Sequence, residues 1–276
     1  MNINGNEIKL VCTDIDGTLV PDGTPDLNPE YYDVVKQLKE KGVMFAAASG
    51  RQCNSIEGIF KPVKDDIIMI GENGGLVICR DQLMSCARID TETAYELIRD
   101  MRKLKNTEIM VATKSNCYIQ KDYEELDDLL TNGYHFKLTR VDDLLTDIDP
   151  EDPIIKVSLY NNHEGAEEIA KDFFAPKWEK REDIQVLCAG FMWLDCISVN
   201  SGKGKAIAEI QRQMGIKPSE TVVFGDNLND IEMLEQAKYS FAVANARDEV
   251  KNAAAGVVDS NVNDGVLKKL KEIFAL

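Results

Sequence analysis

Short apolar runs alternate with amphipathic helical patterns at both ends of the chain, and this alternation limits the possible folds more than any other feature. Residues 8–13, 43–48 and 67–70 form such runs in the first part, and 221–224 and 240–243 form them in the last. Continuous apolar runs of this length are typical of strands that are buried on both faces. Repeated strand–helix–strand units predict an α/β fold, a parallel sheet with helices on both faces.

The segments between these strands carry helix and turn signals. Residues 28–30 (Asn-Pro-Glu) predict a helix start, because asparagine can cap a helix and proline suits its first position. Gly42 predicts the end of that helix. Asn73 and Gly74 predict a turn into a strand at 76–80. Further helices are predicted over 203–214, 229–238, 246–254 and 264–274.

The middle of the chain, about residues 84–191, has a different pattern. Amphipathic helical segments are mixed there with strand segments and are separated by acidic loops such as 147–153. We therefore expect a second α/β unit inserted into the first, so that the core domain comprises 1–83 and 192–276. The predicted helices of the inserted unit cover 91–104, 122–131 and 164–174, and its predicted strands cover 108–112, 154–160 and 184–188.

The chain is strongly acidic, with 48 Asp and Glu against 32 Lys and Arg, which gives a formal net charge of −16. Such a surface repels nucleic acid and anionic lipid, so we expect neither as a partner. It also repels a phosphorylated ligand unless a cation, a lysine or helix N-termini supply local positive charge. No long apolar run and no signal peptide are evident, so we expect no membrane span and a cytoplasmic location. No heptad or interface stripe is evident either, so we predict a monomer with no protein partner.

The cysteines and histidines do not form a recognisable metal or hydrolase motif. The seven cysteines include no C-x-x-C pair, and most lie in apolar runs, so we expect reduced thiols in the core. His135 and His163 are far apart in the sequence and have no cysteine cluster nearby. A zinc site or a Ser-His-Asp hydrolase is therefore poorly supported.

Asp14 and Asp16, in the pentapeptide DIDGT, follow the first apolar strand directly. Ligands of open α/β sheets bind at the carboxyl ends of the strands. A carboxylate there can attack phosphorus and form an acyl phosphate, provided that a cation reduces its repulsion from the phosphate. Mg²⁺ suits this role because it prefers carboxylate and phosphate oxygens. A protonated Asp16 can supply the proton for the leaving oxygen and later activate the water.

Three further polar clusters occur where other strands end. Ser49, in the tripeptide SGR, follows the second strand and can form a phosphate cradle with backbone N–H groups. Lys203 starts a helix, and its ammonium group can pair with phosphate and with Asp14. Asp226 follows the strand at 221–224 and can complete a metal site, with Asp230 supporting it.

Each cluster also has a simpler explanation when taken alone. Asp-Gly is common in turns, and a serine, Asp226 or Asn229 can cap a helix. Lys203 can equally be a solvated side chain beside glycine turns. The joint occurrence of a nucleophile, an acid, a phosphate cradle, a cation and metal ligands at four strand ends favours the catalytic interpretation.

Together these residues resemble the haloacid dehalogenase superfamily, and more narrowly its Cof-like phosphatases. The four motifs of that family match residues 14–18 (DIDGT), 49–51 (SGR), Lys203 in SGKGKAI, and 225–230 (GDNLND). The resemblance covers both ends of the chain, and the middle only by length and position. Further similar positions are 72–74 (ENG), Asn245 and 264–266 (DGV).

The resemblance implies a Rossmann-like core with an inserted α/β cap that sets substrate specificity. It implies a Mg²⁺-dependent phosphatase that acts on a small phosphorylated metabolite through an aspartyl phosphate. Mg²⁺ would be bound by Asp14, the carbonyl of Asp16 and Asp226, with Asp230 close by, and Asn229 would contact the phosphate or the lysine. The implied catalytic residues are Asp14, Asp16 and Lys203, and the implied phosphate- or substrate-binding residues are Thr18, Ser49, Gly50, Arg51, Asn73 and Asn229.

Two departures and two alternatives remain open. Gly75 stands where the subgroup more often has alanine, and the stretch before Lys203 (SVNSGK) differs from relatives, which usually have a proline or glycine nearby. A phosphomutase of the same superfamily shares this motif set. A catalytically idle phosphate-binding module on the same fold is the second alternative.

Overall fold

The structure, a computed structural model, describes residues 2–3, 6–189 and 191–276. The chain divides into two compact units, of which the first comprises Met1–Ser85 with Gly202–Leu276 and the second comprises Cys86–Ser201. Residues 192–201, expected in the core domain, thus lie in the second unit. The reason is that the strand Trp193–Ser198 pairs with two strands of that unit.

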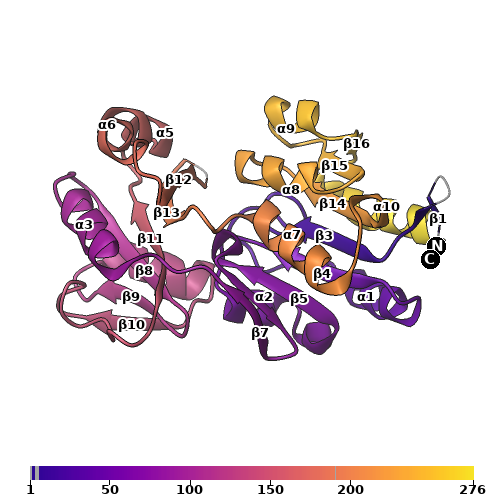
Figure 1. Cartoon of the computed structure of the whole chain (residues 1–276), viewed down its shortest axis with the longest axis horizontal. Helices are drawn as coiled ribbons and strands as arrows, with labels where there is room; N and C mark the ends of the chain where they lie inside the picture. The colour runs from indigo at the N-terminus through magenta and orange to yellow at the C-terminus, as the bar shows by residue number, and fades with distance from the viewer. Residues whose placement is uncertain (1, 4–5, 190) are drawn as a thin grey trace. The chain divides into compact units, whose positions relative to one another are not determined.

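The first unit contains an eight-stranded sheet in the order β16-β15-β14-β3-β4-β5-β6-β7. The strands from β16 to β5 are parallel, and β6 returns antiparallel to β5. Early and late parts of the chain therefore lie side by side, as the indigo β3 and the orange β14 show in Figure 1. The strands are β3 Leu10–Asp14, β4 Met44–Ala48, β5 Ile67–Gly71, β6 Leu76–Cys79, β7 Gln82–Cys86, β14 Thr221–Gly225, β15 Tyr239–Val243 and β16 Gly256–Val258.

The order in which the strands are added to the sheet determines on which of its faces each helix lies. Moving out from β3, the chain adds β4 and β5 on one side, and later adds β14, β15 and β16 on the other. Because crossovers between parallel strands are right-handed, the two directions place their helices on opposite faces. The helices are α1 Glu30–Glu40, α2 Cys53–Ile59, α7 Lys203–Met214, α8 Ile231–Glu235, α9 Asp248–Ala253 and α10 Gly265–Phe274, and a short hairpin, β1 Asn2–Ile3 with β2 Asn6–Glu7, precedes the sheet.

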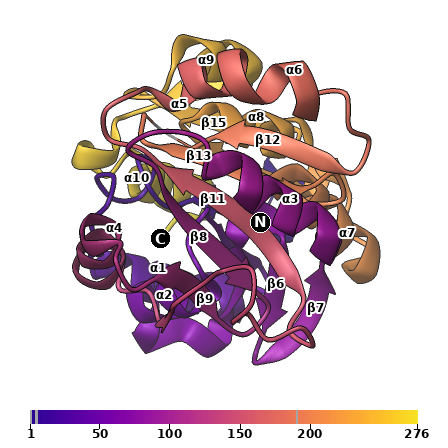
Figure 2. The ribbon, with the colours of Figure 1, turned by 90° about the vertical axis from the view of Figure 1, so that its left-hand side faces the viewer.

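The second unit contains a six-stranded sheet in the order β10-β9-β8-β11-β13-β12. One face is covered by an apolar core to which α3 contributes Leu97, Ile98 and Met101, and Figure 2 shows α3 beside β11. The strands are β8 Glu108–Thr113, β9 Cys117–Gln120, β10 Leu138–Val141, β11 Ile154–Tyr160, β12 Ile184–Cys188 and β13 Trp193–Ser198. The helices are α3 Thr91–Met101, α4 Glu124–Asp128, α5 Ala166–Ile169 and α6 Ala175–Trp178.

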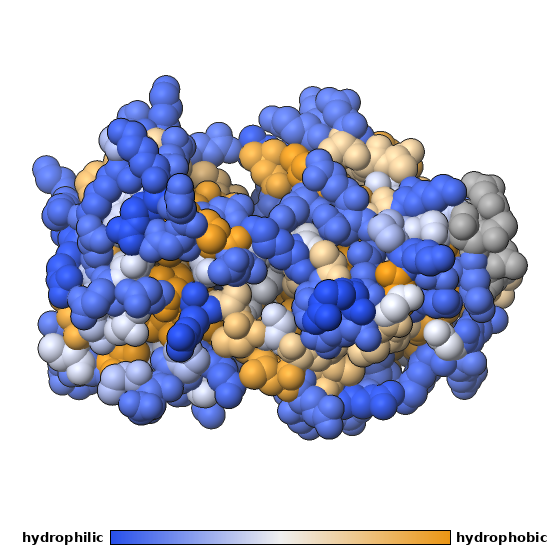
Figure 3. Space-filling view, in the orientation of Figure 1, coloured by the Kyte–Doolittle hydropathy of each residue, from blue (hydrophilic) through white to orange (hydrophobic). Residues whose placement is uncertain are grey.

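The expected fold class, an α/β protein with a parallel core sheet, is confirmed. All seven cysteines are free thiols, as expected, but Cys79, Cys86 and Cys188 are only partly buried. Hydrophilic residues predominate on the face drawn in Figure 3. None of the helices in the described part of the chain is long and apolar enough to cross a lipid bilayer.

Candidate active site

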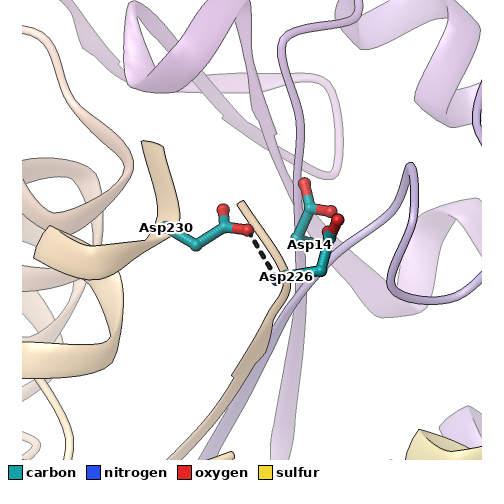
Figure 4. Close-up of side chains that lie close together, drawn as sticks. All are labelled: Asp14, Asp226 and Asp230. Atoms are coloured by element: carbon teal, nitrogen blue, oxygen red, sulfur yellow. Dashed lines mark hydrogen bonds between the residues drawn. The ribbon is translucent and has the colours of Figure 1, made fainter. Parts of the chain in front are cut away.

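The carboxyl ends of β3 and β14 bring two aspartates together. The strands are parallel neighbours, with Thr13 opposite Phe224. Asp14 is the last residue of β3, and Asp226 follows the last residue of β14. Their carboxylates lie side by side in Figure 4. Residues 212 positions apart in the sequence thus meet because two strands are paired, as parallel-sheet topology predicts.

Lys203 provides the positive charge of this cluster. It is the first residue of α7 and is only 2% exposed. Its Nζ lies 2.5 Å from Asp14 Oδ1 and 2.7 Å from Asp230 Oδ1. Burial by itself would lower the pKa of Lys203, but the two carboxylates outweigh burial and raise it. The lysine is therefore a permanent cation inside the site and not a solvated side chain.

Asp226 is fixed from the side of the DIDGT loop. The hydroxyl of Thr18 donates a hydrogen bond to Asp226 Oδ1 at 2.7 Å. Gly17 packs directly on the same carboxylate, since a Cβ at that position would lie 2.3 Å from Asp226 Oδ2. Gly17 also has a φ of +80°, a conformation that side-chain-bearing residues rarely adopt. Both the close packing on Asp226 and the positive φ of the turn therefore favour glycine at this position.

Asp230 joins the lysine to the backbone of the Asp226 loop. Its Oδ2 accepts hydrogen bonds from the N–H groups of Asp226, at 2.9 Å, and Asn227, at 3.1 Å, while Oδ1 faces Lys203. The dashed line in Figure 4 marks the first of these bonds. Asn227 caps the helix that starts here, since its side chain accepts a hydrogen bond from the N–H of Leu228. Asp226 and Asn229, the two candidates from the sequence, do not cap it. Asp230 therefore fixes the loop that presents Asp226.

The three carboxylates form a potential cation site. Asp14, Asp226 and Asp230 each offer an oxygen within 4.8 Å of the others. Burial and the charge of Asp230 raise the pKa of Asp14 well above its usual 3.8, although Lys203 opposes this shift. Burial and Asp230 likewise raise the pKa of Asp226 to about 6. Hard oxygen donors with uncompensated negative charge fit a divalent cation such as Mg²⁺.

Asp16 lies against Arg51. The Nε and Nη2 atoms of Arg51 approach the two carboxylate oxygens of Asp16 at 2.8 and 2.5 Å, and Arg51 is only 2% exposed. The hydroxyl of Ser49 lies 3.3 Å from Asp16 Oδ2 and accepts the N–H of Arg51 at 3.0 Å. Ser49 does not cap α2, which starts after Gln52 without a side-chain cap. The second motif therefore contacts Asp16 through both its serine and its arginine.

Asn73 and Asn229 pair with each other. The side-chain amide of Asn229 donates to Asn73 Oδ1 at 3.1 Å. The resemblance implied that Asn229 contacts the phosphate or the lysine, whereas here it contacts Asn73. Asn73 also packs on Gly50, where a Cβ would lie 3.3 Å from Asn73 Oδ1. The N–H of Asn73 also donates to the carbonyl of Ser49 at 3.0 Å, so Asn73 contacts Ser49, Gly50 and Asn229.

Sequence reasoning missed the loop that follows DIDGT. The N–H of Gly23 donates to Asp16 Oδ1 at 3.3 Å, and the carbonyl of Thr24 accepts from Arg51 Nη2 at 2.9 Å. The Pro-Asp-Gly-Thr sequence at 21–24 predicts a turn. Nothing in its composition indicates that the turn contacts Asp16.

The chain is similar to known proteins over almost its whole length. Residues 11–270 match the haloacid dehalogenase-like hydrolase family. The chain is 29% identical to the 5-amino-6-(5-phospho-D-ribitylamino)uracil phosphatase of Escherichia coli, over 97% of this chain and 96% of that protein. It is also 29% identical to the phosphoglycolate phosphatase of Methanoculleus marisnigri, over 97% of each. A crystal structure from Eubacterium rectale is similar with a TM-score of 0.83 and 34% identity, over 96% of this chain and 99% of that one.

Proposed function

Because the chain belongs to the haloacid dehalogenase-like hydrolases, we propose that it is a Mg²⁺-dependent phosphatase of small phosphorylated metabolites. The observation that carries this proposal is the position of Asp14. Its carboxylate lies at the end of β3, is 4% exposed, and is held 2.5 Å from Lys203 beside two further carboxylates. A carboxylate with a cation on one side and metal-binding oxygens on the other is arranged to accept a phosphoryl group.

In the proposed reaction Asp14 Oδ attacks phosphorus, and the bond between phosphorus and the leaving oxygen breaks. Asp16 gives that oxygen a proton and then takes one from water. The water oxygen bonds to phosphorus as the bond between Asp14 Oδ and phosphorus breaks, which releases inorganic phosphate and restores Asp14. Lys203 and the Ser49 hydroxyl bind the phosphoryl oxygens, and Thr18 keeps Asp226 in place.

The residues that would hold Mg²⁺ are Asp14, Asp226 and the carbonyl of Asp16, while Asp230 fixes Asp226 and Lys203 from behind. All of these donors are hard oxygens, which suit Mg²⁺ better than a softer metal. Mg²⁺ would neutralise the charge between the carboxylates and the substrate phosphate. A carboxylate in an ion pair carries no proton, so Asp16, held by Arg51, must take up a proton before it can act as the acid.

We also propose that the inserted unit sets the choice of substrate. The two named relatives act on phosphates of very different leaving groups, a ribitylaminouracil and glycolate. The described site residues all belong to the first unit, and their chemistry concerns the phosphoryl group. Selection of the leaving group is therefore assigned to residues of the second unit.

The experiment is release of inorganic phosphate from a panel of phosphorylated metabolites and p-nitrophenyl phosphate. Wild type and Asp14→Asn are compared in Mg²⁺ and in EDTA. Release by wild type only, and only with Mg²⁺, would support the proposal. Release that persists in EDTA would contradict the metal requirement, and no release from any compound would contradict the phosphatase assignment.

A further inference from the structure

A short segment after β15 contacts both loops of the acidic cluster. The side-chain amide of Asn245 donates a hydrogen bond to the carbonyl of Gly17 at 2.7 Å. Two residues later, the N–H of Arg247 donates to the carbonyl of Asp226 at 3.1 Å. Gly17 follows Asp16 in the sequence, and its Cα packs on the Asp226 carboxylate. Residues 245–247 therefore connect the two loops that would share the metal ion.

Asn261 extends this connection. Its N–H donates to Asn245 Oδ1 at 3.0 Å, and its side-chain amide donates to the carbonyl of Val20 at 3.3 Å. The same Val20 carbonyl accepts the N–H of Gly17 at 2.8 Å. Both peptide groups of Gly17 are thus held, one through Val20 and the other through Asn245. The Gly17 N–H and the Asp16 carbonyl belong to the same peptide group. The hydrogen bond to Val20 therefore involves the peptide group that carries the Asp16 carbonyl.

We infer that Asn245 is a positioning residue for the Mg²⁺ site, which it serves through Gly17 and without touching the metal. The inference rests on the proposed function, since it assumes that Asp226 and the Asp16 carbonyl bind Mg²⁺. If the Gly17 carbonyl is released, the Asp16 carbonyl turns and the surface that supports the Asp226 carboxylate moves. Residues that orient metal ligands in this way typically change metal affinity by about 10- to 100-fold when they are replaced.

The test is Mg²⁺ affinity without substrate, measured by titration calorimetry on wild type, Asn245→Ala and the control Asn263→Ala. Asn263 is an exposed asparagine near the same loop, and its amide contacts only Asp259, at 3.2 Å, among the described contacts. Asn245 is also exposed, so the alanine variant leaves no buried cavity. We expect the Kd for Mg²⁺ to rise about tenfold in Asn245→Ala and to stay unchanged in Asn263→Ala. A cooperative thermal transition in EDTA checks that all three proteins are folded.

Asn245→Asp separates positioning from charge. The aspartate can still accept the N–H of Asn261, but it cannot donate to the Gly17 carbonyl. Positioning predicts weaker Mg²⁺ binding in this variant although a negative charge is added, whereas a purely electrostatic effect predicts tighter binding. A Kd for Asn245→Ala equal to that of wild type would overturn the inference and leave the proposed function intact. Failure of wild type to bind Mg²⁺ would overturn both.

Discussion

At the scale of single residues, the site has more buried negative charge than its lysine can neutralise. Asp14, Asp226 and Asp230 lie within 4.8 Å of one another, and Lys203 contacts two of them. Buried charges are costly unless they are paired, so the cluster without a metal favours protonation of its carboxyls. This explains why the pKa values of Asp14 and Asp226 are both raised.

The raised pKa of Asp226 predicts that Mg²⁺ stabilises the protein more as the pH increases. A carboxyl whose pKa is higher in the folded state binds its proton more tightly there, so the folded protein loses stability when that carboxyl ionises. The pKa of Asp226 changes from 3.8 to about 6, so in EDTA this loss should develop between these pH values. Mg²⁺ binds the ionised form and offsets the loss.

Melting temperatures in Mg²⁺ and in EDTA, measured across this pH range, test the prediction. Their difference should grow as the pH increases from 3.8 to about 6. In Asp226→Asn, which cannot ionise, the difference should be small and should not depend on pH in this way. A wild-type difference that decreases with pH would show that the sign of the argument is wrong.

Arg51 gives a second prediction at this scale. It fixes the position of the Asp16 carboxyl through two hydrogen bonds, so its removal should leave that carboxyl poorly aimed at the leaving oxygen. We expect Arg51→Ala to lower kcat by about a hundredfold on an alkyl phosphate and by much less on p-nitrophenyl phosphate. Nitrophenolate is a good leaving group and needs little protonation. Arg51→Lys should restore part of the loss, and equal losses on both substrates would contradict a role through Asp16.

At the scale of elements, the turn Glu72–Gly74 joins three parts of the site. The N–H groups of Glu72 and Asn73 donate to the carbonyls of Arg51 and Ser49, at 2.9 and 3.0 Å. Glu72 and Asn73 both have a φ of +53°. Two consecutive residues in the left-handed region are strained and persist only where the surrounding structure fixes them. The turn therefore couples the second motif to the start of α7.

Gly74 makes this coupling testable. A Cβ there would lie 2.2 Å from the carbonyl oxygen of Gly202, directly before Lys203, and the φ of Gly74 is +85°. Gly42 has a similar φ of +74° but open space around it, so it is a matched control. Urea unfolding should show a loss of about 1 kcal/mol for Gly42→Ala from the backbone alone. Gly74→Ala should lose about 3 kcal/mol or more and should also lower kcat, because α7 must move. Equal losses in the two variants would contradict the close approach.

The elements themselves could largely be predicted from the sequence, whereas several contacts could not. The five apolar runs correspond to β3, β4, β5, β14 and β15, because burial on both faces produces an unambiguous pattern. The strand at 193–198 was not predicted, and its residues were placed in the core domain, because the sequence does not reveal that they pair with β11 and β12. The pairs Arg51–Asp16 and Asn73–Asn229 depend on side-chain direction after a turn, which spacing alone does not determine.

At the scale of the whole molecule, the chain divides into two units. We propose that the first carries out phosphoryl transfer and that the second selects the substrate. We predict that exchanging residues 86–201 for the matching segment of the E. coli relative changes the order of preference within a substrate panel. Mg²⁺-dependent hydrolysis of p-nitrophenyl phosphate should persist in this chimera, since the described site residues lie in the first unit. An unchanged preference in a folded chimera would contradict the assignment of specificity to the second unit.

The central claim is that Asp14 is the nucleophile, and the most direct measurement is detection of its phosphorylated form. Wild type and variants are mixed with p-nitrophenyl phosphate and Mg²⁺ and quenched in acid, and the peptide that contains Asp14 is analysed by mass spectrometry. The account predicts a phosphoryl group on Asp14 in wild type, more of it in Asp16→Asn, which activates water poorly, and none in Asp14→Asn. A phosphoryl group on another residue, or unchanged phosphate release by Asp14→Asn, would contradict it.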